Sequence, residues 1–91
     1  MSRLRIAPRA RLRFDRLEQR HVLLSPERGL ALSETATLIV QLCDGASGEA
    51  GIVDACVARY GEEHRARIEV DVRAVIADLL ARGLLVAVGP E

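Results

Sequence analysis

Two cysteines and two histidines are the side chains of this chain that are best suited to metal or thiol chemistry. Cys43 and Cys56 do not form a CxxC pair, and only His21 and His64 are available as further ligands. A structural zinc site needs four ligands in closely spaced pairs, and this spacing is missing. Both cysteines fall within helical apolar patterns, so we interpret them as small buried hydrophobic residues. We predict no metal site.

Hydroxyl and carboxylate groups form no recognisable catalytic arrangement either. Ser25 and Ser33 stand in turn and helix-cap contexts, and neither has a histidine nearby in the sequence to act as a base. The pair Glu62-Glu63 belongs to a charged loop, and the sequence contains no glycine-rich phosphate loop. The sequence therefore predicts a protein that is not an enzyme, with no catalytic residue and no cofactor.

Short extended segments make up the first third of the chain. Apolar residues alternate with polar ones over 11–15, which is typical of a half-buried strand. A turn at 17–19 separates this segment from a second one at 20–25. Pro26 and Gly29 then favour a tight turn before a third strand at 29–32, because Pro restricts φ and Gly accepts positive φ. These segments predict a small antiparallel sheet.

Three helices are expected to follow, each with apolar residues at helical spacing. The first, at 34–43, begins after Ser33, whose hydroxyl can accept a hydrogen bond from a free N–H group of the first turn. Ser47 can cap a second helix that ends at Gly61, and Gly83 closes a third helix at 69–82. The expected core positions are Ala36, Ile39, Val40, Cys43, Ile52, Val53, Cys56, Val57, Tyr60, Val72, Val75, Ile76 and Leu79.

A second, weaker stripe on the third helix suggests a binding groove. Alanines keep this side slim enough for another backbone to approach, although close packing against the sheet is the simpler explanation. The strand at 29–32 could form the opposite wall, since its residues are small or apolar and no proline interrupts it. The candidate residues are Gly29, Leu30, Ala31 and Leu32 of the strand and Arg73, Ala77, Leu80 and Leu84 of the stripe.

Charge is divided unevenly along the chain. Residues 1–28 hold eight arginines against three carboxylates, whereas residues 29–91 hold five arginines against ten carboxylates. Such asymmetry fits a nucleic-acid arm, a site for an acidic partner or a solvated surface. We expect a basic flexible arm at 1–10, a single domain at 11–88 and a tail at 89–91.

Targeting and membrane-spanning signals are missing from the sequence. No apolar segment precedes the arginines at 9–13, and no apolar run approaches the length of about 20 residues that spans a bilayer. We expect a cytoplasmic protein with reduced thiols and no membrane contact. Since the chain has one Phe, one Tyr and no Trp, its core must consist mainly of aliphatic residues.

Three strands and three helices in a chain of this size predict an α+β fold of the winged helix-turn-helix type, with a small three-stranded antiparallel sheet followed by a three-helix bundle. This architecture supports two different functions. One is DNA binding through the arginine-rich N-terminal region, although Glu69, Asp71 and Asp78 on the third helix would repel phosphates. The other is β-augmentation, in which an extended peptide pairs with the strand at 29–32.

Short motifs in a specific order give the chain a resemblance to a known family. Together they cover most of the chain from Pro8 to about Leu85, and they resemble the PqqD family of pyrroloquinoline quinone biosynthesis. Ser33 stands where Asn is expected to be common in that family, and both residue types cap helices well. The motifs are LRFD (12–15), RHVLLSPE (20–27), LSETA (32–36), LCDG (42–45), ARYG (58–61), DV (71–72) and RGL (82–84).

The resemblance implies a RiPP recognition element, a small winged-helix domain that binds the leader of a ribosomally made precursor peptide. The implied partners are the PqqA precursor and PqqE, the radical SAM enzyme that joins a Glu and a Tyr side chain within it. The family's binding mode implies that the peptide lies along 29–32 and against the second stripe, where Arg73 could meet a leader carboxylate. The arginine-rich region 3–20 is a candidate surface for PqqE.

No nucleic-acid partner is expected from the resemblance. We expect a monomer in dilute solution. A strand-exchanged dimer about the hinge at 27–29 is the alternative, because the edge strand is exposed.

Overall fold

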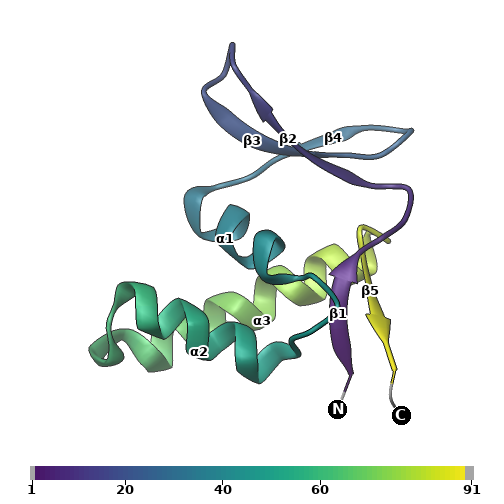
Figure 1. The fold of residues 1–91 in the computed structure, drawn as a ribbon. Helices are drawn as coiled ribbons and strands as arrows, with labels where there is room; N and C mark the ends of the chain where they lie inside the picture. Colours follow the sequence, from purple (N-terminus) through teal and green to yellow (C-terminus); the bar gives the residue numbers. More distant parts are fainter. Residues whose placement is uncertain (1, 90–91) are drawn as a thin grey trace.

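The computed structural model describes residues 2–89, in which two separate antiparallel sheets accompany three helices (Figure 1). The sheet of β2, β3 and β4 lies over α1, and α2 and α3 lie on the side of α1 away from that sheet. The elements are β1 (Arg3–Ile6), β2 (Arg11–Asp15), β3 (Arg20–Leu24), β4 (Gly29–Ala31), α1 (Glu34–Leu42), α2 (Glu49–Tyr60), a 3-10 turn (Glu62–His64), α3 (Arg65–Ala81) and β5 (Leu85–Val88). The predicted α+β class with a three-stranded sheet and three helices is confirmed.

A row of leucines holds the three-stranded sheet on the helices. Leu23 pairs with Leu12 on one side and with Leu30 on the other. Leu23 is completely buried, and the two outer leucines pack partly buried against the core. Because alternate residues of a strand face opposite sides, this row fixes which face of the sheet covers the helices.

Capping explains where α1 begins. The Ser33 hydroxyl accepts a hydrogen bond from the N–H of Ala36 at 3.1 Å, as the sequence predicted. The predicted cap of the second helix was wrong, because Gly48 occupies the N-cap of α2 and the cap has no side-chain hydrogen bond. The predicted start of the third helix was also wrong, since α3 begins at Arg65 and buries Ile68 one turn before Val72.

The core draws on all three helices and both sheets. The side chains with less than 2% of their surface exposed are Leu23, Ile39, Val40, Ile52, Cys56, Val72, Leu79 and Leu85, together with others of the same apolar kind around them. Burial of aliphatic side chains supplies most of the stability of a domain that contains so few aromatic residues. No helix within residues 2–89 is long and apolar enough to cross a membrane.

The prediction of a flexible arm at 1–10 was wrong for the residues described. β1 pairs with β5, and the N–H of Leu4 donates to Ser47 O while its carbonyl accepts from Gly45 N. Leu4, Ala7 and Ala10 are buried, so the domain begins at Arg3 instead of Arg11. Arginine and apolar residues alternate over 3–6, which is typical of a strand. The high arginine content led us to predict a basic arm instead.

The predicted tail at 89–91 lies mostly outside the described residues. Within them, the Arg3 guanidinium donates two hydrogen bonds to the carbonyl of Gly89, at 2.7 and 2.9 Å. This side-chain contact holds the residue that follows β5 against β1. Pro90 and Glu91 are not described.

Candidate functional site

The open edge of β4 presents unpaired backbone groups. On the β3 side, the N–H of Leu32 donates to His21 O at 2.9 Å, and the N–H of Ser25 donates to Arg28 O at 2.8 Å. Hydrogen-bonded and non-hydrogen-bonded pairs alternate along an antiparallel ladder, and Leu23 pairs with Leu30 between these two bonds. The N–H and C=O groups of Gly29 and Ala31 therefore point away from β3, toward the open edge.

A hollow of about 340 Å³ lies beside this edge and will be called the β4 hollow. Leu30 and Leu84 provide its apolar lining, and Arg28 and Arg82 also line it. Glu27 is the carboxylate among its lining residues, together with the hydroxyl of Ser25. The β4 hollow thus offers space for an apolar side chain with cations close by.

The end of α3 directs Leu84 into the β4 hollow. Gly83 has φ of +75°, its N–H donates to Leu80 O at 3.0 Å, and the N–H of Leu84 donates to Leu79 O at 2.9 Å. This pair of hydrogen bonds is a Schellman motif, and a left-handed residue at this position favours glycine. Leu84 therefore leaves the helical path of α3 before it reaches β4.

The stripe predicted on α3 does not continue to Leu84, because Leu84 lies beyond the left-handed Gly83 that ends the helix. The Arg73 guanidinium donates to the Glu49 carboxylate of α2 at 2.9 Å. Arg73 and Arg82 are separated by about two and a half helical turns, so their side chains point to opposite sides of α3. By the same helical phase, Ala77 and Leu80 lie nearer to the Arg73 side.

Of the predicted site residues, the structure brings together Leu30 and Leu84, and it keeps Arg73 apart from them. Gly29 and Ala31 are exposed on the edge strand, Leu32 is buried, and Ala77 and Leu80 are exposed. Sequence reasoning missed Arg28 and Arg82 as neighbours of Leu30. The available signal was the glycine predicted to end the third helix directly after Arg82, because such a glycine redirects the chain away from the helical path.

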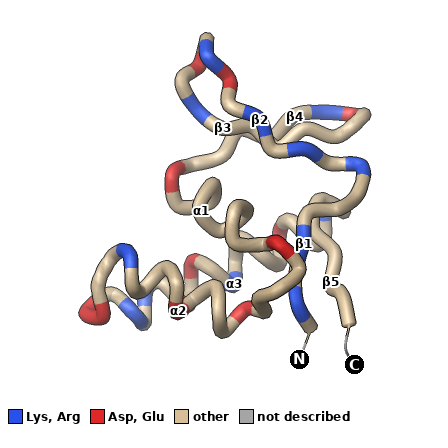
Figure 2. Tube along the Cα trace, in the orientation of Figure 1, with Lys and Arg blue, Asp and Glu red and all other residues tan. Residues whose placement is uncertain are grey.

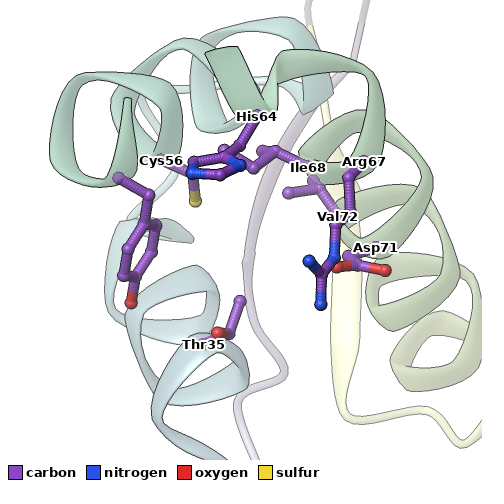
Figure 3. A pocket seen from close by; sticks show the side chains of 8 residues that line it. Thr35, Cys56, His64, Arg67, Ile68, Asp71 and Val72 are labelled. Carbon is purple, nitrogen blue, oxygen red and sulfur yellow. The ribbon is translucent and has the colours of Figure 1, made fainter. Parts of the chain in front are cut away.

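A second, smaller hollow of about 210 Å³ lies between the three helices (Figure 3). Arg67 and Asp71 project from α3 into space that Thr35 of α1 and Cys56 of α2 also border. Burial raises the pKa of the Cys56 thiol, which keeps it protonated and poorly nucleophilic. This hollow can therefore receive a side chain but contains no activated thiol.

Ion pairs occupy most of the arginines on α3. Arg65 donates to Glu62 at 2.6 Å and to Asp54 at 3.1 Å, and Arg82 donates to Asp78 at 3.0 Å. The hydrogen bond from Arg65 lowers the pKa of Glu62, and the same contact raises the pKa of Arg65. Guanidinium groups that already bind carboxylates are poorly placed to hold phosphates, so α3 lacks the basic surface of a DNA-reading helix.

Arginines are concentrated on the strands and the turns between them (Figure 2). Arg11, Arg13, Arg16 and Arg20 belong to β2, β3 and the turn between them, with Asp15 and Glu18 as the carboxylates there.

Among residues 2–89, no group of three or more His, Cys, Asp or Glu side chains lies close enough to hold a metal ion.

Comparison with known families gives a match over most of the chain. The family model described as coenzyme PQQ synthesis protein D (PqqD) matches residues 20–85. A Rhodopseudomonas palustris protein named PqqA binding protein is 51% identical over 81 residues, which cover 88% of this chain and 78% of the relative. A Methylococcus capsulatus protein of the same name is 36% identical over 80 residues, covering 88% of this chain and 83% of the relative.

A bifunctional coenzyme PQQ synthesis protein C/D of Methylorubrum extorquens is 35% identical over 75 residues, which are 82% of this chain and 20% of that longer protein. A solution NMR structure of the PqqD truncation of Methylobacterium extorquens PqqCD has a TM-score of 0.75 and 32% identity, with 91% of this chain and 87% of that chain covered. That truncation is described as a functional, stand-alone RiPP recognition element.

Proposed function

The chain belongs to the PqqD family, and we propose that it binds the PqqA precursor peptide by strand addition and presents it to the radical SAM enzyme PqqE. In this role the protein is an adaptor, or peptide chaperone, that acts in the cytoplasm and performs no chemistry itself. The relatives named PqqA binding protein support PqqA as the ligand. The solved RiPP recognition element with a similar fold supports a role in recognising a precursor peptide.

The observation that carries the binding mode is the outward orientation of the backbone of Gly29 and Ala31 beside the β4 hollow. A peptide strand laid along β4 would pair with these groups and regain the hydrogen bonds that it loses to water. Alternate peptide side chains would then face the side on which Leu30 lies. One of them can enter the space between Leu30 and Leu84.

Charge around the β4 hollow bears on the sequence of the bound peptide. Arg28 and Arg82 lie with the two leucines, although Arg82 also pairs with Asp78. An apolar peptide side chain next to a carboxylate would satisfy both parts of this surface. Arg73, Ala77 and Leu80 remain predicted contacts from the sequence, and a peptide that follows β4 would not need them.

The turn between β3 and β4 favours a monomer. Ser25 and Arg28 close it through backbone hydrogen bonding, and Arg9 donates to Glu27 at 2.7 Å. Strand exchange about the hinge at 27–29 would have to open these contacts in both chains. We therefore propose that a monomer binds one peptide.

An amide-shift titration of ¹⁵N-labelled protein tests the function. Synthetic PqqA should shift the signals of Gly29–Ala31, Arg82 and Leu84, whereas a DNA duplex of similar charge should leave them unchanged. Absence of any response to saturating PqqA would overturn peptide binding. Salt-sensitive shifts of the arginines in β1 and β2 with DNA would favour the nucleic-acid function instead.

A further inference from the structure

The two aromatic side chains of the protein, Phe14 and Tyr60, line the same cleft. This cleft of about 410 Å³ lies under the hairpin of β2 and β3, against α1 and the end of α2, and will be called the hairpin cleft. Phe14 is 50% exposed although the core of this small domain contains no aromatic residue. An aromatic side chain that is left open to solvent is typical of a surface that contacts another protein.

The walls of the hairpin cleft are held in position by aromatic contacts. The rings of Phe14 and His21, which are opposite each other on β2 and β3, meet edge to face with their centroids 5.1 Å apart. The guanidinium of Arg59 lies 5.8 Å from the centroid of the Tyr60 ring. Leu38 of α1 adds aliphatic surface to the same cleft. A partner would meet a preformed socket, which lowers the entropy that binding costs.

Positive charge surrounds this socket. Arg20 and Arg59 line the hairpin cleft, and within residues 2–89 neither of them forms an ion pair. Glu34 is the one carboxylate among the described lining residues. The cleft is therefore complementary to an apolar side chain that is flanked by carboxylates.

The tip of the same hairpin displays a further apolar side chain. Leu17 is 94% exposed, and the turn that carries it is fixed by the Asp15 carboxylate, which accepts from the N–H of Leu17 at 3.0 Å and of Glu18 at 3.3 Å. Gln19 completes the turn with φ of +57° and a side-chain hydrogen bond to Arg16 O at 2.7 Å. The leucine is thus held out from the domain by a defined turn.

We propose that the hairpin cleft and Leu17 form a second docking surface, which binds an acidic segment of the processing enzyme through an apolar side chain flanked by carboxylates. This inference rests on the proposed function, in which that enzyme is PqqE. β3 separates the two surfaces, because the Leu17 turn precedes it and the turn beside the β4 hollow follows it. Leu32 lines the hairpin cleft and is buried in the core. The backbone N–H and C=O of its neighbour Ala31 point to the open edge of β4. Peptide and enzyme can therefore bind at the same time.

The test measures the affinity of the full-length protein for PqqE and, separately, for PqqA. Phe14→Ser and Arg59→Glu should each weaken PqqE binding about tenfold, as truncation of a contact at the centre of an interface does. Their affinity for PqqA should stay within about twofold of the wild type, which also shows that they fold. Leu17→Ser should weaken PqqE binding in the same direction and removes no core contact, since Leu17 is almost completely exposed.

Two exposed positions far from the hairpin provide matched controls. Val70→Ser removes an apolar side chain that is 65% exposed on α3, and Arg73→Glu reverses an exposed charge on the same helix. Neither change should affect PqqE binding. Wild-type affinity of Phe14→Ser, Arg59→Glu and Leu17→Ser for PqqE would overturn the second surface, as would a parallel loss of PqqA binding in these variants. Failure of the unaltered protein to bind PqqA would instead contradict the proposed function itself.

Discussion

Leu30 of β4 and Leu84, the residue after the left-handed Gly83, line one hollow although they come from distant parts of the chain. The sheet positions Leu30 through its pairing with Leu23, and the Schellman motif of α3 positions Leu84. A peptide that pairs with the edge of β4 meets both side chains. The side of α3 that carries Arg82, and not the side that carries Arg73, is therefore the one expected to influence peptide affinity.

Charge reversal at these two arginines distinguishes the two sides of α3. Arg82→Glu should weaken PqqA binding about tenfold, because it removes a cation from the β4 hollow and adds a carboxylate near Asp78 and Glu27. Arg73→Glu is the matched control, since Arg73 is also exposed and also pairs with a carboxylate, that of Glu49. Calorimetric titration with PqqA measures both. A larger loss of PqqA affinity in Arg73→Glu than in Arg82→Glu would instead support the α3 stripe that the sequence predicted as the binding surface.

Proline at position 31 tests the use of the backbone edge. Ala31→Pro removes an N–H that points away from β3, so the β3–β4 ladder keeps its own hydrogen bonds. We expect PqqA affinity to fall about five- to tenfold. The lost hydrogen bond costs roughly 1 kcal/mol, and the proline ring also hinders the approach of the peptide backbone. Ala31→Val keeps the N–H and should bind PqqA normally. Equal affinities of the two variants would show that the peptide does not pair with β4.

Denaturation tests whether the N-terminal residues belong to the domain. Leu4→Ala should lower the free energy of unfolding by about 2–3 kcal/mol, because Leu4 is 5% exposed and its loss leaves a cavity between β1 and the core. Arg5→Ala, at the next and exposed position, should change it by less than about 0.5 kcal/mol. Urea unfolding followed by circular dichroism measures both values. Similar free energies of unfolding for the two variants would show that residues 3–6 form an arm that is not packed on the domain.

Alkaline pH should destabilise the protein through Cys43. Burial, and next the carboxylate of Asp44, raise the pKa of this thiol to about 11. The folded state then keeps a proton that the unfolded chain releases at the ordinary thiol pKa, so the free energy of unfolding falls as pH rises from that value toward 11.

The variant Cys43→Ala isolates this contribution, because all other titrating groups are shared with the wild type. Between neutral pH and pH 11, the wild type should lose on the order of 1–2 kcal/mol more than the variant in urea unfolding experiments. Parallel pH profiles for the two proteins would mean that Cys43 ionises equally well in the folded and unfolded states.

Local patterns were sufficient to predict much of the fold. The alternation over 11–15, the turn before β4 and the Ser33 cap depend on neighbouring residues, and each appears where it was predicted. Apolar spacing likewise identified the buried faces of the helices, including Ile39 and Val72. Such features are decided within one or two turns of the chain.

Features that depend on distant pairing could not be predicted in the same way. β1 and β5 lie at opposite ends of the sequence, and each is short and acquires its partner only in the folded chain. The α3 stripe was extended in phase past the end of the helix to Leu84, but Gly83 redirects the chain at that point. The contact between Arg73 and Glu49 joins two helices, which spacing within α3 alone does not reveal.

Amide hydrogen exchange at four consecutive residues is the most direct test of strand addition. In the free protein, Leu30 and Leu32 should exchange slowly because their N–H groups bond to β3, whereas Gly29 and Ala31 should exchange quickly. Saturating PqqA should slow exchange at Gly29 and Ala31 by about tenfold or more, since these N–H groups would then bond to the peptide. If both amides still exchange at the free-protein rate while PqqA is bound, the peptide does not add a strand to β4.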